Sequence, residues 1–132
     1  MVTNELPICP SCGDDLHQDN EYKNCYYCNL CKNRFVEVDG SFSLCTFIEF
    51  PNKRMIPEGH FKNRENIRHV VVTNHIRFIN DEAFKDCVAL TTIELPKELS
   101  TIGKDAFSGC VKLKSISIPN GATSIGAGAF EY

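Results

Sequence analysis

Two closely spaced pairs of cysteines are the residues in this sequence whose type and spacing could do chemistry. Cys9 and Cys12 are separated by two residues, and after 15 intervening residues Cys28 and Cys31 repeat that spacing. Two thiolates so spaced can hold one metal ion from a tight turn, and two such pairs complete a tetrahedral site. The spacing therefore predicts one Zn²⁺ held by these four cysteines. Four thiolates leave no coordination position open for water, so we expect the metal to be structural and not catalytic.

A fifth cysteine in the same region leaves the ligand set open. Cys25 forms its own C-x-x-C pair with Cys28, so a set that includes Cys25, or one that includes His17, is an alternative. A disulfide or a metal-free segment is a further alternative. The aromatic residues that flank the second pair, among them Phe35, favour the first set because they can pack against the turn that holds the metal.

The elements that must position these cysteines are expected to be short strands. Tyr26-Tyr27 and residues 35–38 have the composition of the two arms of a β-hairpin. The segment 7–38 resembles the zinc-ribbon family, with Lys32 at a position where that family often has a second glycine. A segment of this size cannot bury enough apolar surface to fold alone, so the metal is expected to hold it together.

A change of composition near residue 40 predicts two domains. Residues 1–41 contain three basic and seven acidic residues, a net charge of −4, whereas residues 42–132 contain 11 basic and 10 acidic residues, a net charge of +1. The turn-forming sequence Asp39-Gly40-Ser41 lies at this change. We therefore expect a zinc ribbon over residues 1–41 and a second domain over residues 42–132.

The sequence contains no feature that predicts export or membrane insertion. The N-terminus has no basic start followed by an apolar run, and no stretch approaches the roughly 20 apolar residues of a membrane span. Paired C-x-x-C cysteines without an export signal favour metal binding over disulfides. We therefore expect a cytoplasmic protein with no membrane partner.

The second domain is built from an internal repeat of 23 residues. Apolar residues recur at this spacing in several columns: Ile79/Ile102/Ile125, Phe84/Phe107/Phe130, Cys87/Cys110, Leu90/Leu113, Ile93/Ile116 and Pro96/Pro119. The register extends upstream through Phe61 and Val70, and residues 45–51 match residues 90–96. A fixed period of this length is typical of a solenoid.

The repeated pattern, L-x-x-I-x-[IL]-P followed by I-G-x-x-A-F-x-x-C, resembles the BspA-type leucine-rich repeats of bacteria and some protists. Residues 102–110 match this pattern best, and Arg64 departs from it at the cysteine position of the first coil. The resemblance covers residues 42–132 and implies a right-handed solenoid of about four coils. Each coil is expected to have one short strand, a turn and a short helical segment, so the fold class is mainly β with short helical segments.

Within such coils, residues at equal positions are expected to stack. Parallel strands lie about 4.8 Å apart, so Phe84, Phe107 and Phe130 should form an internal ladder of rings. Cys87 and Cys110 are expected to be small core residues with no redox role. Every second strand residue points outwards, and these residues form the predicted partner-binding face: Phe47, Glu49, His69, Val71, Thr92, Glu94, Ser115 and Ser117.

A repeat architecture without a catalytic motif predicts a protein-interaction module and no enzyme. The sequence has no Gly-rich phosphate loop, nucleophile elbow or H-E-x-x-H motif. Solenoids bind partners on the face formed by stacked strands, so an adaptor, or a regulator or inhibitor of a larger partner, is expected. Phe47 and Val71 are apolar on that face, which predicts contact with a partner or with the chain's own N-terminus. Strand edges also pair, so self-association through the C-terminal edge of the solenoid is a further expectation.

A local excess of positive charge in the first coil supports an alternative function. Six basic residues lie between positions 53 and 77: Lys53, Arg54, Lys62, Arg64, Arg68 and Arg77. They form either a solvated face or a dock for an acidic surface or a phosphate backbone. Nucleic-acid binding by the ribbon and this basic patch is therefore the alternative, although the acidic ribbon weakens the attraction of phosphate.

Overall fold

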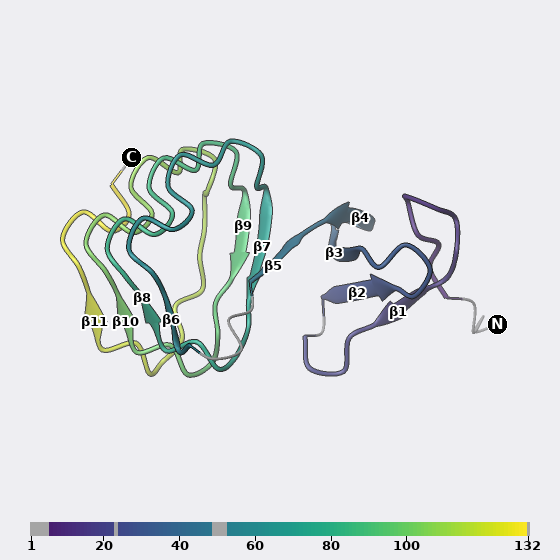
Figure 1. The fold of residues 1–132 in the computed structure, drawn as a ribbon, viewed down its shortest axis with the longest axis horizontal. Coiled ribbons are helices and arrows are strands. Elements are labelled where there is room, and N and C mark those ends of the chain that lie inside the picture. Colours follow the sequence, from purple (N-terminus) through teal and green to yellow (C-terminus); the bar gives the residue numbers. More distant parts are fainter. Residues whose placement is uncertain (1–5, 23, 49–52, 132) are drawn as a thin grey trace. The chain divides into compact units, whose positions relative to one another are not determined.

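In a computed structural model, which describes residues 6–22, 24–48 and 53–131, the chain forms two compact units, Met1–Cys45 and Thr46–Tyr132 (Figure 1). Both units consist of strands, turns and irregular segments, and no described residue is helical. The fold is therefore mainly β, as the sequence predicts.

The first unit is a four-stranded antiparallel sheet in the order β1-β2-β3-β4. Its strands are β1 (Leu16–Gln18), β2 (Cys25–Cys28), β3 (Arg34–Val38) and β4 (Ser41–Leu44). The predicted hairpin is present as β2 and β3, in which Tyr26 pairs with Phe35. Strands β1 and β4 extend this hairpin on either side. They were not predicted because segments of only three and four residues are too short to give a clear strand pattern.

The turn at Asp39 and Gly40 explains why the first unit extends beyond the predicted boundary at residue 41. Both residues have positive φ angles, 50° and 83°, and Val38 pairs with Ser41 across them. This is a two-residue hairpin turn, for which Asp-Gly is a favoured sequence. The turn therefore returns the chain to the sheet as β4, and the first unit ends at Cys45.

The coils of the second unit carry strands on two of their sides, so that stacking of the coils forms two parallel sheets. One sheet has the order β5-β7-β9 and the other the order β11-β10-β8-β6. The first consists of β5 (Thr46–Ile48), β7 (His69–Val72) and β9 (Thr92–Glu94); the second consists of β6 (Met55–Ile56), β8 (Phe78–Ile79), β10 (Thr101–Ile102) and β11 (Ser124–Ile125). Ile79 of β8 pairs with Ile102 of β10, so neighbouring coils are in register one 23-residue repeat apart and the predicted solenoid is confirmed.

The register of β5 differs from the predicted one by two residues. Matching residues 45–51 with residues 90–96 places Ile48 at the level of Val70, whereas the structure pairs Ile48 with Val72. A displacement by two residues leaves each side chain on its expected face, because side chains alternate with a period of two. Phe47 therefore lies beside Val71 on the outward face.

The short helical segments predicted for each coil are replaced by turns in the described residues, so that prediction was wrong. Two sets of equivalent residues, four positions apart in each coil, have φ angles between 55° and 79°: Gly59, Glu82, Asp105 and Gly128 in the first set, and Asn63, Asp86 and Gly109 in the second. A residue in the left-handed region interrupts a right-handed helix. With two such residues per coil, the segment can form turns but not a helix.

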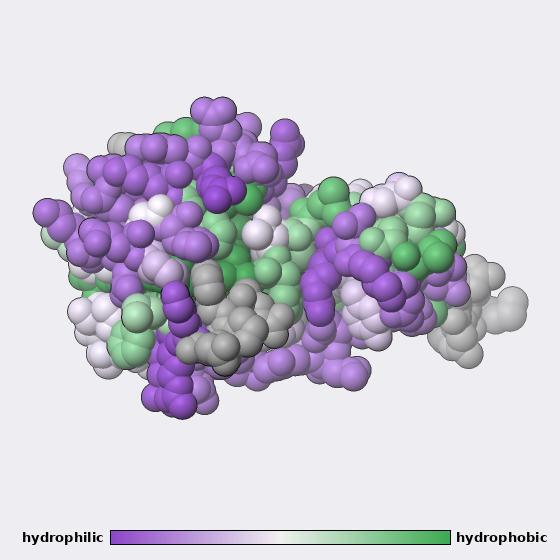
Figure 2. Space-filling view, viewed as in Figure 1, coloured by the Kyte–Doolittle hydropathy of each residue, from purple (hydrophilic) through white to green (hydrophobic). Residues whose placement is uncertain are grey.

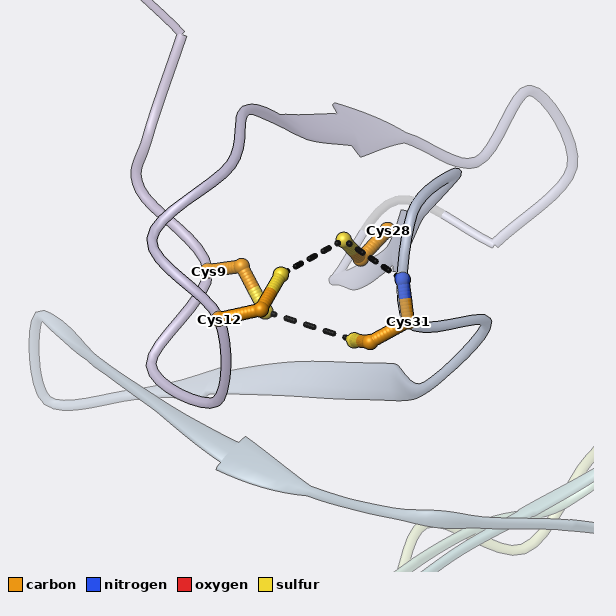
Figure 3. A group of neighbouring side chains, drawn as sticks. All are labelled: Cys9, Cys12, Cys28 and Cys31. Atoms are coloured by element: carbon orange, nitrogen blue, oxygen red, sulfur yellow. Dashed lines mark hydrogen bonds between the residues drawn. The ribbon is translucent and has the colours of Figure 1, made fainter.

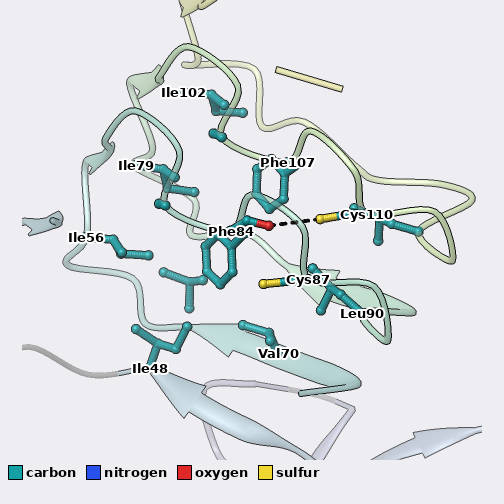
Figure 4. Packing of buried hydrophobic residues seen from close by; sticks show 14 of the residues in the cluster. Ile48, Ile56, Val70, Ile79, Phe84, Cys87, Leu90, Ile102, Phe107 and Cys110 are labelled. Carbon is teal, nitrogen blue, oxygen red and sulfur yellow. Dashed lines mark hydrogen bonds between the residues drawn. The ribbon is translucent and has the colours of Figure 1, made fainter. Parts of the chain in front are cut away.

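The interior of the repeat unit consists of stacked columns of equivalent residues (Figure 4). One column contains four phenylalanines: Phe61, Phe84, Phe107 and Phe130. Their rings stack with centroid distances of 5.2, 5.2 and 5.5 Å and interplanar angles of 11°, 3° and 2°. These distances lie in the favourable range for aromatic pairs. The predicted ladder is therefore confirmed, and Phe61 extends it by one ring.

The two cysteines of the coils bond to the backbone of the preceding coil. The thiol of Cys87 donates to the carbonyl of Phe61, and the thiol of Cys110 donates to the carbonyl of Phe84, each at 3.1 Å. Both cysteines are fully buried. Each of these carbonyls also accepts a hydrogen bond from a backbone N–H, that of Arg64 and that of Cys87 respectively, at 3.2 Å, so each thiol fills space and adds a further hydrogen bond between neighbouring coils.

The outermost coil is less regular than the others. Residues 113–118, which the repeat predicts to contain its strand, do not form one, although Ile116 and Ile118 pack against the core. On the face drawn in Figure 2 the repeat unit is mostly hydrophilic, which agrees with apolar columns that point inwards.

Candidate metal centre and outward faces

Four thiols of the first unit lie together between two turns (Figure 3). The sulfurs of Cys9 and Cys31 are 3.6 Å apart, those of Cys12 and Cys28 are 3.5 Å apart, and all four lie within 4.8 Å of one another. A tetrahedron with Zn–S bonds of about 2.3 Å has sulfurs about 3.8 Å apart, whereas the sulfurs of a disulfide are about 2 Å apart. The arrangement can therefore hold a tetrahedral metal ion.

The two cysteine pairs lie in turns with the same backbone geometry. The N–H of Gly13 donates to the carbonyl of Cys9 at 2.9 Å, and the N–H of Lys32 donates to the carbonyl of Cys28 at 3.0 Å. Gly13 and Lys32 also share a left-handed conformation, with φ angles of 82° and 66°. Lys32 thus takes the backbone conformation of the glycine that zinc ribbons often have there, at the cost of some strain because it carries a Cβ.

The crowding of the four thiols alters their acidity. Burial desolvates Cys9 and raises its pKa, but hydrogen bonds from the backbone N–H groups of Cys12 and Ser11 outweigh that effect and lower the pKa to about 7. For Cys12, a backbone hydrogen bond from Asp14 lowers the pKa, but desolvation and the neighbouring thiols together raise it to about 12. One thiolate thus opposes ionisation of the next, and a divalent cation would remove that opposition. The site should therefore release protons when it takes up a metal.

The alternative ligands Cys25 and His17 lie elsewhere in the first unit. Cys25 is buried at the start of β2, where it pairs with Val36 of β3. His17 lies in β1, and its ring stacks on that of Tyr27 with centroids 5.5 Å apart. Among the described residues, the four thiols above are the one group of three or more ligating side chains close enough to share an ion. The geometry therefore favours the first ligand set.

The predicted partner-binding face lies on the outward side of sheet β5-β7-β9. His69 and Thr92 occupy the same position in consecutive coils, and a hydrogen bond of 2.8 Å joins their side chains. Val71 is fully buried and Phe47 is half-buried, while Glu49 lies outside the described residues. The exposed members of this face are Glu94, Ser115 and Ser117. The most exposed part of the face is therefore polar.

The predicted basic patch is divided among four segments of the repeat unit. Lys53, Arg54 and Arg77 precede strands of the second sheet, Lys62 and Arg64 lie in the turns after β6, and Arg68 precedes β7. Lys62 forms an ion pair with Glu82 at 2.7 Å, and Arg77 forms one with Glu98 at 3.5 Å. Part of the positive charge is thus compensated within the repeat unit itself.

Residues 39–132 match the family model of the BspA type leucine-rich repeat region, with six copies of the repeat. The chain belongs to the BspA-type leucine-rich repeat family. A leucine-rich repeat protein from Bacteroides ovatus ATCC 8483 is 24% identical, with a TM-score of 0.60 over 76% of this chain and 31% of that one. A leucine-rich cell surface protein from Faecalibacterium prausnitzii A2-165 is 26% identical, with a TM-score of 0.59 over 80% of this chain and 30% of that one. This chain therefore spans less than a third of either structure, and no curated protein was found to match it.

Membership of the BspA-type family supports a coarse statement of function. Leucine-rich repeats are commonly protein-interaction modules, because stacked coils present an extended surface. The family match begins at residue 39, so most of the four-thiol unit lies outside it. Within the described residues there is no helix long and apolar enough to cross a membrane.

A second outward column on these BspA-type coils was not predicted from the sequence. It consists of the first residues of the strands in the second sheet: Met55, Phe78, Thr101 and Ser124. A weak signal was present, since Arg-Met-Ile at 54–56 and Arg-Phe-Ile at 77–79 repeat the same order of residue types. Strands of two residues are too short to show an alternating pattern, which is why the column was not predicted.

Proposed function

We propose that this chain is a non-enzymatic protein-binding module, in which the outward face of sheet β5-β7-β9 contacts a protein partner and one structural Zn²⁺ holds the first unit together. The observation that carries the proposal is the side-chain column in which His69 is hydrogen-bonded to Thr92 across one repeat. Parallel pairing holds the strands of this sheet in place, so its outward side chains need little ordering when a partner binds. An adaptor, or a regulator or inhibitor of a larger partner, requires such a pre-formed surface.

Site-specific photocrosslinking tests this face. A photoreactive amino acid placed at Thr92 or Ser115 should form adducts with a protein in extracts of the source cells. The same group at Lys112, which is exposed in a turn of the repeat unit, is the matched control and should form none. Mass spectrometry of the adducts identifies the partner. Equal labelling from all three positions, or no labelling, would contradict the proposed face.

The zinc proposal rests on the sulfur–sulfur distances and on the closed shell of four thiols. Native mass spectrometry of the untagged protein should show one metal ion per chain, and elemental analysis should identify it as zinc rather than iron. Chelation should unfold the first unit alone, because its small core depends on the ion. Cys12→Ser should abolish binding of the ion, whereas Cys25→Ala should retain it.

The same mass spectrum tests the proposed cytoplasmic location. Reduced thiols with bound zinc are expected in the cytosol, where disulfides are rare. A metal-free chain that is lighter by two hydrogen atoms for each cysteine pair would mean oxidation to disulfides instead. That result would contradict both the zinc site and the cytoplasmic location.

Nucleic-acid binding through the ribbon and the basic patch remains the alternative function. Retention on DNA or RNA at low salt, falling steeply as the salt concentration rises, would favour it over protein binding. If the protein is not retained on DNA or RNA at low salt, nucleic-acid binding is excluded.

Self-association at β11 is a further proposal for the repeat unit. Ile125 of this edge strand is 49% exposed, whereas Ile102, its partner in β10, is fully buried. An exposed strand edge with an apolar side chain can pair with another chain. A monomeric mass that does not change with concentration in analytical ultracentrifugation would contradict this proposal.

A further inference from the structure

The outward side of the second sheet carries two arginines and two large apolar side chains that the proposed function does not use. We call Arg54, Met55, Arg77 and Phe78 the arginine–apolar face. Met55 and Phe78 are paired across β6 and β8 (Figure 1) and remain 44% and 41% exposed. The isoleucine that follows each of them points inwards and is fully buried. The two exposed side chains therefore lie on strands that are anchored in the core by these buried isoleucines.

The fold does not require large side chains at these positions, as the later coils show. At the equivalent positions the last two coils have small hydroxyl residues: Ser100 and Thr101 in one, and Thr123 and Ser124 in the other. The strands pair in the same register throughout, and Ile102 is as fully buried as the isoleucines of the earlier coils. Met55 and Phe78 are adjacent on this surface, and contiguous exposed apolar side chains, unlike single ones, mark sites of interaction.

Local contacts hold the face in shape. The backbone N–H of Arg77 donates to the carbonyl of Arg54 at 2.7 Å, so the two arginines are fixed in consecutive coils. The side-chain amide of Asn80 donates to the sulfur of Met55 at 3.1 Å. The Arg77 guanidinium lies 3.5 Å from the carboxylate of Glu98, and both side chains are substantially exposed. This exposed ion pair is weak, so a better-placed carboxylate from a partner can replace Glu98.

We propose that the arginine–apolar face binds an acidic segment of a protein partner, which places a large apolar side chain against Met55 and Phe78 and carboxylates against Arg54 and Arg77. Arginine, methionine and aromatic residues are the types enriched in protein interfaces, whereas serine, which stands in the later coils, is depleted there. Charge complementarity selects an acidic partner, because arginines flank both apolar side chains. This surface is distinct from the face of sheet β5-β7-β9 and adds a second contact site to the module.

A protein segment fits this face better than a nucleic acid does. Phosphate binding depends on several cations that act together, but the Arg77 guanidinium lies beside the carboxylate of Glu98, and the chain as a whole has a net charge of −3. Burial of the apolar area at the centre of the face is most favourable when the ligand covers it with an apolar side chain.

Selection from a phage-displayed library of random peptides on the full, metal-loaded chain tests the inference. The enriched peptides should combine acidic residues with a large apolar residue. Two double variants remove each half of the face with residue types from the chain's own later coils, which keeps the coils intact. Met55→Thr with Phe78→Thr removes the apolar pair, and Arg54→Ser with Arg77→Ser removes the charge.

Each double variant should weaken the selected peptides by about tenfold or more, because burial of one large apolar side chain or loss of a charge pair has effects of that size. Val111→Thr, which removes an exposed apolar side chain elsewhere in the unit, is the matched control and should bind as the wild type does. Circular dichroism of every variant confirms that the fold is retained.

Four outcomes would overturn the inference. Enrichment of no peptides would do so, as would peptides that bind all variants equally. Peptides sensitive only to Thr92 or Ser115 substitutions would support the proposed function while refuting this one. A single-stranded RNA probe that binds the wild type but not the arginine variant, in the absence of selected peptides, would assign the face to nucleic acid instead.

Discussion

The stacked phenylalanines of the repeat unit allow a quantitative test of how the coils are held together. Phe107 lies between Phe84 and Phe130, with ring centroids 5.2 Å away on one side and 5.5 Å away on the other. Its side chain is fully buried, whereas that of Phe130 is half-buried. Phe107→Ala therefore removes a ring that is in contact on both of its faces.

The expected loss follows from this packing. Replacement of a buried phenylalanine by alanine costs about 3–5 kcal/mol, and each stacked pair contributes about 0.5–1.5 kcal/mol beyond its buried area. We expect Phe107→Ala to lower the free energy of unfolding by about 4–5 kcal/mol, near the upper end of the range for a buried phenylalanine. Phe130→Ala, with less burial, should cost about half as much on the same scale. Phe107→Leu preserves most of the volume and should cost about 1.5 kcal/mol.

Urea denaturation followed by circular dichroism, with zinc present throughout, measures these free energies. Three of the four tyrosines, Tyr22, Tyr26 and Tyr27, lie in the first unit, so tyrosine fluorescence reports mainly on that unit. Hydrogen exchange then shows whether protection is lost in the coils next to Phe107. The reasoning is refuted if Phe107→Ala costs no more than Phe130→Ala, because the contribution of the ladder would then not depend on burial between two rings.

Further predictions concern glycine positions and one ion pair. Gly103→Ala would place a Cβ 2.5 Å from the backbone nitrogen of the preceding coil, so we expect a loss of about 1–3 kcal/mol in urea denaturation, whereas Gly121→Ala, with its nearest atom at 3.8 Å, should be nearly neutral. In the metal turns, Gly13→Ala should lower the chelator concentration needed to remove zinc, and Lys32→Gly should raise it, because a left-handed residue with a Cβ costs about 1–2 kcal/mol. Desolvation raises the pKa of Asp19, but backbone hydrogen bonds and its pairing with an arginine lower it overall, so Asp19→Asn should destabilise the first unit by about 1 kcal/mol at neutral pH. This difference should be complete above the ordinary pKa of an aspartate and should disappear as the pH falls through the lowered value; a difference that is independent of pH would show that the charge is not responsible.

The metal ligands could be predicted because their signal lies in short sequence spacings. Two C-x-x-C pairs form two local turns, and the hairpin β2–β3 then only has to bring those turns together. Cys25 could not be excluded from the sequence alone, since it has the same spacing to Cys28. It is the strand conformation of residues 25–28 that separates Cys25 from the other thiols. The period of the solenoid and its ring ladder were predictable for a similar reason, because the repeat makes every coil an independent observation of the same pattern.

The turns and the second sheet could not be predicted because their causes are not periodic in residue type. Glu82 and Asp105 have the left-handed conformation that Gly59 and Gly128 have in other coils, and nothing about an acidic side chain in the sequence indicates it. The conformation is imposed by stacking: the backbone N–H of Glu82 donates to the carbonyl of Lys104 in the next coil at 2.9 Å. Local propensity is overridden there by hydrogen bonds between coils.

Comparison of equivalent positions within the chain separates what the fold needs from what it leaves free. The phenylalanine column is constant in all four coils, and the cysteine thiols that follow it bond to the carbonyl groups of that column. By contrast, the outward column of the second sheet changes from Met55 and Phe78 to Thr101 and Ser124 without a change of register. Since the backbone is the same at all four positions, the difference in side chains cannot be attributed to folding. A surface that varies along a constant framework is where a repeat protein can distinguish its partners, and here the variation is confined to the coils that also carry Arg54 and Arg77.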